Sequence, residues 1–495
     1  MATDQIRSGR LEGGRPAAVE QYLSSMEADK QIASSDIRVD IAHILMLRKQ
    51  NLIDAESAKK LLKALMGYLE SGLPADAFNV TREDIHAGIE AQLMADAGSD
   101  AGGRMHLGRS RNDEVATCLR MRTRELLIET LSGLFEVRQA LISRAEEHTN
   151  TIMPGFTHLQ HAQPTTLAHY LLAYESLFAR DTSRLFDAYS RVNISPLGSA
   201  AFAGTGFPLD RKLTAEYLGF TDPMDNSMDA VANRDFIAES LSDLAILMVN
   251  ISRMCEELIL WSTSFVRFVN LNDAYCSTSS IMPQKKNPDT LEIMRAKSAA
   301  VIGELTAALT LIKSLPMSYN RDLQDLNPHL WNAFAQTNAS LPILAEIIST
   351  AEFNVPVMKK QAAAGNTTAT ELADFMVREY NIPFRTAHNI VGRAVKLGSL
   401  ELDVVETAAK ELANISLKEK GLTEETIKKV LHPATILREK KSFGSPNPKM
   451  MKKAVKVADI RLVQDQVTGD ILQDQLRDAD EKMKTAYRNL INDSE

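Results

Sequence analysis

The longest apolar stretch of the chain covers residues 228–269, and its pattern predicts one long helix. Its middle part, F-I-A-E-S-L-S-D-L-A-I-L-M-V-N-I-S-R-M, is apolar on most faces. At about 1.5 Å per residue, such a helix would extend over roughly 60 Å. A helix so long and so apolar must be buried by other helices, and we expect some of these to belong to other subunits.

Helical periodicity also dominates the remainder of the chain, whereas alternating β-branched runs are scarce. We therefore predict an all-α fold in three parts: an N-terminal helical domain (1–107), a central long-helix bundle (108–360) and a C-terminal helical domain (361–495). The charged segment 457–489 is predicted to form a solvated helix. The other predicted helices cover residues 35–49, 54–71, 113–149, 165–191, 287–314, 327–350, 370–379, 383–397 and 423–431.

Charge and cysteine content narrow the class of protein. The net charge is -8 with both signs interspersed, so we expect no nucleic-acid binding through a basic surface. The three cysteines, Cys118, Cys255 and Cys276, include no close pair. This argues against a disulfide scaffold or a structural zinc site and favours a reducing cytoplasm. We expect no membrane span and no signal peptide, and we interpret the polar, glycine-rich residues 1–16 as a loose arm.

The densest group of reactive residue types is S-T-S-S-I-M-P-Q-K-K-N-P-D, residues 277–289. Its end resembles a helix start, with Asn287 as N-cap, Pro288 at the first helical position and Asp289 at the positive end of the dipole. The serines and lysines then lie on a loop before a helix N-terminus, which favours a bound anion and a loop that closes over substrate. The alternative is a purely structural helix start after a solvated turn.

Two further polar clusters lie at predicted helix ends. In H-L-G-R-S-R-N-D-E, residues 106–114, the guanidinium groups of Arg109 and Arg111 suit carboxylates. The alternative is a charged loop in which Asn112 or Asp113 caps the next helix. In G-F-T-H-L-Q-H-A-Q-P-T-T, residues 155–166, His158 and His161 could share a helical face, but no carboxylate ligand pair or HExxH pattern supports a metal.

A fourth stretch, Y-N-R-D-L-Q-D at residues 319–325, suits several contacts with a guanidinium or amide group, or a plain surface turn. Together, and in this order, the clusters resemble the fumarase/aspartase superfamily of lyases, whose third motif reads S-S-x-M-P-x-K-x-N-P. Within it, the motifs quoted above, together with N-S-M-D-A-V-A-N-R-D-F and P-L-G-S-A-A-F-A-G-T-G-F-P-L-D-R, are most similar to the argininosuccinate lyase family. The likeness extends from about residue 25 to about residue 446.

This resemblance implies an all-helical homotetramer with a bundled core and four active sites, each built from three subunits. It implies reversible β-elimination of argininosuccinate to arginine and fumarate, as in arginine biosynthesis. The general base is then Ser279, with Ser280 as the alternative, and its alkoxide is stabilised by Lys285 and by loop N–H groups. Lys285 and Asn287 would also stabilise the doubly charged carboxylate, while Lys286 would point outward.

The resemblance assigns the remaining residues to substrate. It pairs His158 with Glu292, and His158 either donates the proton to the leaving group or only orients substrate. Contacts with the substrate are implied for Thr157, for Arg111 and Asn112 at carboxylate and amide groups, for Arg234 at the fumarate-side carboxylate, for Ser25 and Asp84 from the N-terminal part, and for Tyr319 and Gln324 at the arginine side.

Three departures from the family pattern bear on specificity. Thr278 stands where a glycine is usual before the serine pair, Asp40 where a serine is usual, and Asn327 where a lysine is expected near the amino-acid end of the substrate. Two alternatives stay open: a related lyase for adenylosuccinate or aspartate, and an inactive, crystallin-like relative. No metal, nucleotide or flavin motif occurs, so we expect a small-molecule substrate and no cofactor.

Overall fold

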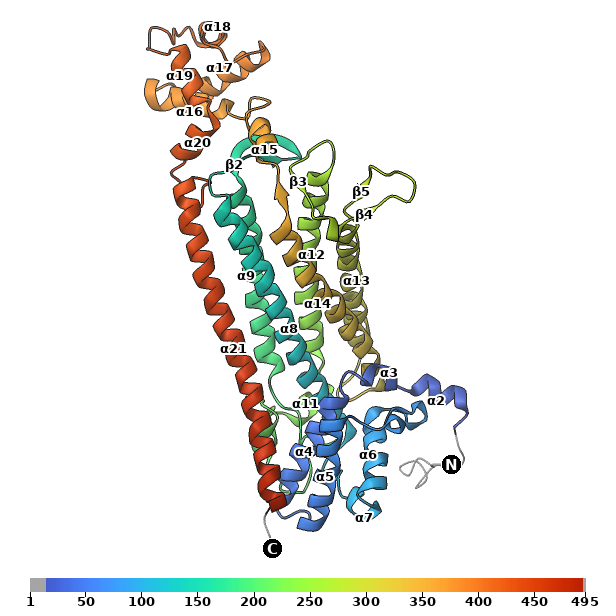
Figure 1. Ribbon diagram of the computed structural model, residues 1–495. Helices are drawn as coiled ribbons and strands as arrows, with labels where there is room; N and C mark the ends of the chain where they lie inside the picture. Colours follow the sequence, from blue (N-terminus) through green and yellow to red (C-terminus); the bar gives the residue numbers. More distant parts are fainter. Residues whose placement is uncertain (1–14, 493–495) are drawn as a thin grey trace.

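The structure is a computed structural model that describes residues 15–492, so most of the predicted N-terminal arm lies outside it. The predicted all-α class is confirmed, because helices form nearly all of the regular structure (Figure 1). Five long helices run along one another in a rod: α8 (Arg111–Glu147), α9 (Leu167–Val192), α12 (Asp235–Ser262), α13 (Asp289–Ile312) and α14 (Leu326–Thr350). α8 is continuous and lies between α9 and α14.

The prediction of one helix over 228–269 is wrong. The segment divides into α11 (Ser227–Ala232) and α12, because Asn233 and Arg234 leave the helical conformation. The Asn233 side chain accepts a hydrogen bond from the Asp235 N–H at 3.1 Å, which holds the turn between the two helices, and Arg234 is the N-cap residue of α12. The short helix α10 (Arg211–Tyr217) precedes this break.

The N-terminal helices pack around the lower end of the rod in Figure 1. They share one continuous hydrophobic core with the bundle, so the bundle end and the N-terminal part hold each other in place. Their bounds are α2 (Ala17–Leu23), α3 (Met26–Asp29), α4 (Ala33–Lys49), α5 (Ala55–Ser71), η1 (Ala75–Phe78), η2 (Val80–Arg82), α6 (Ile85–Asp96) and α7 (Ser99–Gly102).

Short antiparallel strand pairs lie at the opposite, upper end (Figure 1). β1 (Ile152–Thr157) pairs with β2 (Gln160–Thr166), β3 (Val269–Asn270) with β6 (Glu352–Phe353), and β4 (Ser277–Thr278) with β5 (Lys286–Asn287). Asn287 therefore belongs to a strand, and the predicted N-cap is wrong: α13 begins at Asp289 after Pro288, without a side-chain cap. A short 3-10 helix, η3 (Asp273–Tyr275), connects β3 to β4, and another, η4 (Arg321–Asp325), connects α13 to α14.

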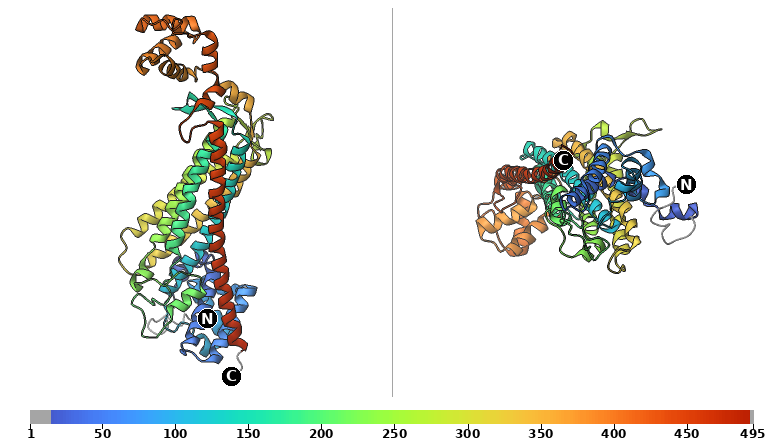
Figure 2. Two further views of the ribbon diagram at one scale, coloured as in Figure 1. Left: turned by 90° about the vertical axis from the view of Figure 1, so that its left-hand side faces the viewer. Right: turned by 90° about the horizontal axis from the view of Figure 1, so that it is seen from below.

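Beyond the upper end, a small helical unit has its own hydrophobic core. It follows α15 (Val355–Ala362) and contains α16 (Ala369–Tyr380), α17 (Phe384–Lys396), α18 (Leu402–Ala413), α19 (Glu424–Val430) and α20 (Pro433–Glu439). The last helix, α21 (Pro448–Asn492), returns along the whole rod and packs on α8 and α9 (Figure 2). It is thus solvated on one face only, and side chains such as Leu462 and Met483 are buried on the other.

Candidate functional site

A cavity of about 180 Å³ lies at the lower end of the bundle, between the N-terminal helices and the starts of α8, α12 and α14. It brings together seven residues that the sequence analysis assigned to substrate, although they are scattered over about 300 positions of the chain. They are Ser25, Asp84, Arg111, Asn112, Arg234, Tyr319 and Gln324.

Helix ends place the first of these side chains. Asp84 is the N-cap of α6 and accepts a hydrogen bond from the Ala87 N–H at 2.7 Å, while its other oxygen lies 3.2 Å from Arg111 Nη1. Arg111 begins α8, whose N-cap is Ser110 and not Asn112 or Asp113, because Ser110 and Asp113 form a capping box. Asn112 donates to the Ala201 carbonyl at 3.0 Å. The ion pair with Asp84 therefore fixes Arg111 at the cavity wall.

Arg234 is placed by the helix break described above and is only 1% exposed. Its Nη1 donates to the carbonyls of Val231 and Asn233, and no carboxylate within residues 15–492 forms an ion pair with it. Burial lowers the pKa of this guanidinium to about 10. A buried cation without a counter-ion favours an anionic ligand, which suits the predicted contact with a substrate carboxylate.

His158 and Thr157 lie about one bundle length away, on the exposed β1–β2 hairpin at the upper end. The expectation of a shared helical face for His158 and His161 is wrong. His158 and Leu159 form the hairpin turn with φ values of 55° and 57°, and His161 follows on the second strand. Two non-glycine residues in the left-handed region are unfavourable, and such strain concentrates at functional sites.

Ser279, Lys285 and Asn287 belong to the β4–β5 hairpin, also at the upper end. The Ser279 hydroxyl oxygen accepts hydrogen bonds from the Met282 N–H at 3.0 Å and the Ile281 N–H at 3.3 Å. Donors placed in this way stabilise an alkoxide. Lys286 is held by Asp273 at 2.6 Å, so it turns back onto the preceding segment. Lys285 is exposed and forms no ion pair within the described part of the chain.

The predicted residues thus form two groups at opposite ends of one chain. α8 has 37 residues and links the lower cavity to the upper hairpins, which corresponds to a separation of about 55 Å. Glu292 is exposed in the first turn of α13, and neither a hydrogen bond nor an ion pair joins it to His158 within residues 15–492. A single chain therefore does not assemble the candidate site.

A buried charged cluster lies behind the cavity wall. Arg109 Nη2 is 2.6 Å from Asp40 and 3.0 Å from Glu114, so Arg109 serves the interior and not a ligand. His86, which lines the cavity, is 2.8 Å from Asp36. Burial alone would lower the pKa of His86, but the Asp36 and Glu114 carboxylates outweigh it and hold that pKa well above its ordinary value.

Within residues 15–492, the side chains with metal-ligand spacing belong to this cluster: Asp36 with His86 and Cys118, and Asp36 with Asp40 and Glu114. Arg109 and His86 already provide the positive charge there, so the arrangement suits an internal ion network better than a cation site.

The cavity residues that the sequence analysis missed include Asp29 and Arg321, and it assigned no contact to a further lining residue, Asn327. Asp29 accepts a hydrogen bond from the Ser25 hydroxyl at 2.6 Å, and burial raises its pKa to about 6. Arg321 is 2.8 Å from Glu83 at the rim. Asn327, singled out only as a departure from the family, is buried in the wall. The residues come together because α3 packs against α14, a contact between distant parts of the chain that a local sequence pattern does not predict.

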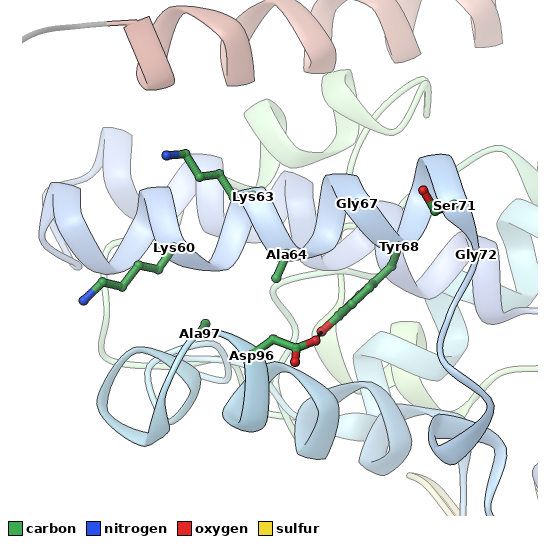
Figure 3. A pocket seen from close by; sticks show the side chains of 9 residues that line it. All are labelled: Lys60, Lys63, Ala64, Gly67, Tyr68, Ser71, Gly72, Asp96 and Ala97. Carbon is green, nitrogen blue, oxygen red and sulfur yellow. Dashed lines mark hydrogen bonds between the residues drawn. The ribbon is translucent and has the colours of Figure 1, made fainter.

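A second, open cavity lies between α5 and α6, where Tyr68 donates a hydrogen bond to Asp96 at 2.5 Å (Figure 3). Lys60 and Lys63 line it, but it contains none of the predicted site residues. No helix among residues 15–492 is both long and apolar enough to cross a membrane.

The comparisons agree with this architecture. Residues 9–303 match the Lyase family, and residues 366–438 match the argininosuccinate lyase C-terminal family. A curated argininosuccinate lyase from Methanocorpusculum labreanum is 90% identical over 490 residues, covering 99% of this chain and 100% of that protein. The argininosuccinate lyase of Methanoculleus marisnigri is 57% identical, covering 90% of this chain and 91% of its own.

Solved structures show the same fold. An EDDS lyase in complex with formate is similar with a TM-score of 0.85 and 29% identity, covering 99% of both chains. A class II fumarase from Schistosoma mansoni shares the fold alone, with a TM-score of 0.67, 16% identity and coverage of 81% of this chain and 90% of its own. This chain therefore belongs to the argininosuccinate lyase family of the fumarase/aspartase superfamily.

Proposed function

We propose that Ser279 is the general base of a carbon–nitrogen lyase that cleaves argininosuccinate reversibly to arginine and fumarate. The family membership carries the reaction, and no observation favours the adenylosuccinate, aspartate or crystallin-like alternatives. The assignment of Ser279 as the base is supported by the hydrogen bonds that its side chain accepts. The Ser279 oxygen already accepts from two backbone N–H groups, whereas no such donors are directed at Ser280 within the described residues.

The successive steps of the reaction can be assigned to the two groups of residues. Ser279 removes a proton from the carbon next to a carboxylate, and the extra negative charge on that carboxylate is stabilised by Lys285 and Asn287. The carbon–nitrogen bond then breaks, its electron pair goes to the guanidino nitrogen, and the arginine half leaves as a neutral guanidine that takes up a proton to become the guanidinium. In this proposal His158, supported by Glu292, faces the leaving group, and Thr157 contacts the fumarate half.

The lower cavity would hold the rest of the substrate. Arg111, Asn112 and Arg234 supply donors for carboxylates. Acceptors and hydroxyls for the arginine half come from Ser25, Asp84, Tyr319 and Gln324. Tyr319 is suited to a neutral donor role, because burial raises the pKa of its hydroxyl.

We further propose a homotetramer in which neighbouring subunits bring the upper and lower groups together. The packing of α13 supports this. Few side chains of α13 are buried within the chain, and several of its exposed side chains are apolar, among them Ile293, Ile302 and Leu309. An apolar helix at the edge of a bundle (Figure 1) needs a partner surface. Three free cysteines agree with a reducing cytoplasm.

Ultraviolet detection of fumarate tests the reaction, with argininosuccinate as substrate and adenylosuccinate and aspartate as controls. Ser279→Ala should lower kcat by about 10³-fold, the range for loss of a general base, while Ser280→Ala retains most of the activity. Equal losses in the two variants, or full activity of Ser279→Ala, would reject Ser279 as the base.

Hybrid oligomers test the shared site. Ser279→Ala and Arg111→Leu inactivate opposite ends of the chain, so each variant alone should be inactive. After the two are unfolded together and refolded as a mixture, about a quarter of the sites should combine an intact loop with an intact cavity and recover activity. A mixture that stays inactive, although hybrids have formed, would refute sites shared between subunits.

A further inference from the structure

The outward face of α21 carries a row of exposed apolar side chains. Ile460, Val463, Val467 and Ile471 are each at least 50% exposed. Their spacing of three and four residues places them on one face of the helix, away from the face on which Leu462 is buried against the rod. Scattered exposed apolar residues are ordinary, but a row of four along one helix face indicates a contact surface.

Charged side chains continue this row in both directions with the same spacing. They are basic toward the upper end of α21 and acidic toward its lower end. The six exposed residues are Lys449, Lys453 and Lys456 above, and Asp474, Asp478 and Glu481 below. Within residues 15–492, none of the six forms an ion pair with a side chain outside α21. The outward face is thus basic, then apolar, then acidic along its length.

This order of charges suits an antiparallel copy of the same helix. When a two-fold axis passes near position 465, each basic residue faces an acidic residue of the second copy, and the apolar residues face one another. The facing pairs are Lys449 with Glu481, Lys453 with Asp478, Lys456 with Asp474, Ile460 with Ile471, and Val463 with Val467. A parallel arrangement would place like charges opposite one another, which is unfavourable.

We propose that α21 is a self-association surface, on which a second copy of this chain packs antiparallel about a two-fold axis. α21 and α13 lie on opposite edges of the rod (Figure 1), so this contact is separate from the tetramer contact proposed for α13. It joins assemblies that form through α13 into larger ones. The candidate site residues lie on elements other than α21, so the inference is independent of the proposed function.

The size of the surface sets the expected affinity. At about 1.5 Å per residue, the row from 449 to 481 extends over about 50 Å, and a helix face about 10 Å wide buries about 500 Å² per copy. A total of about 1,000 Å² is at the low end for specific interfaces, so we expect weak association with a dissociation constant of about 1–100 µM. Because the ion pairs are exposed, added salt should weaken the association.

Sedimentation equilibrium of the full chain tests the surface. At about 200 µM chain and low salt, the average mass of the wild type should be at least about 1.5 times that of Val467→Glu, because the variant places a charge within the apolar row. Leu412→Glu is the matched control: Leu412 of α18 is 49% exposed, against 52% for Val467, but it lies outside the row. The control should associate like the wild type. A Val467→Glu protein with the mass of the wild type overturns the inference.

Charge reversal tests the antiparallel register. Lys453→Glu and Asp478→Lys each make two facing pairs repulsive and should weaken the association by at least about fivefold, whereas the double variant should associate within about twofold of the wild type. Both positions are exposed, so these variants test the inference even where thermal unfolding shows that Val467→Glu is not folded. Single variants that associate like the wild type, or a double variant as weak as the single ones, overturn the antiparallel pairing.

Discussion

Acidification should destabilise this protein through one buried histidine, His43 of α4. His43 is 1% exposed, and its Nε2 lies 3.0 Å from the carbonyl of Leu107, within the polar cluster 106–114. Burial, reinforced by the nearby Arg109 guanidinium, lowers the pKa of His43 to about 3. In the unfolded chain a histidine has a pKa of about 6.5. Because the unfolded state binds the proton first, the stability from neutral His43 is complete above about pH 6.5 and is lost as the pH falls toward 3.

The size of the effect follows from these two pKa values. At pH 5, about 1.5 units below the pKa of His43 in the unfolded chain, the histidine is protonated in the unfolded state and neutral in the folded state. This difference stabilises the unfolded state by about 2 kcal/mol. His43→Gln can still donate to the Leu107 carbonyl but does not titrate. Between pH 7.5 and 5 the wild type should therefore lose about 2 kcal/mol more of its free energy of unfolding than the variant.

Urea unfolding at equal protein concentrations measures this difference. His388→Gln, at an exposed histidine of α17, is the matched control and should lose as much as the wild type. If His43→Gln also loses as much as the wild type between the two pH values, the reasoning from burial to proton linkage is refuted.

Three further sets of variants test the structure of the chain. Glu175→Gln disrupts a buried ion network in which Arg138 Nη2 lies 3.1 Å from Glu175, and it should lower the free energy of unfolding in urea by about 3–5 kcal/mol. Its control, Glu239→Gln, breaks an exposed pair with Arg191 and should lower that free energy by at most about 1 kcal/mol. Asp84→Ala removes the N-cap of α6 and should lower the free energy of unfolding by about 1 kcal/mol, whereas Asp84→Asn keeps the cap and should raise only KM. Equal losses of stability in the two variants would contradict the capping role. Thr278→Gly weakens the β4–β5 ladder and should make tryptic cleavage after Lys285 several-fold faster on gels, and unchanged cleavage would show that threonine does not restrain this loop.

Local chemistry predicted most helices but not their interruptions. The long helices α8 and α14 match their predicted ranges closely, because apolar periodicity extends over many turns. The break at Asn233 and Arg234 was missed, since two residues that leave the helical conformation hardly disturb the apolar pattern. The hairpin at His158 was missed as well, because its turn lacks the usual Asn-Gly signal. The roles of the site residues stay predictions, carried by the family motifs.

The distribution of the site along one chain restricts how subunits can assemble. If subunits associated side by side in the same direction, every upper hairpin would remain about 55 Å from every lower cavity. A two-fold axis perpendicular to the bundle instead reverses the neighbour, so that its upper hairpins lie beside the cavity of the first chain. The exposed apolar residues of α13 run between these two ends and are available for such a contact. Antiparallel neighbours are therefore a requirement of the proposed chemistry: a parallel-only oligomer with full activity would disprove the two-ended site.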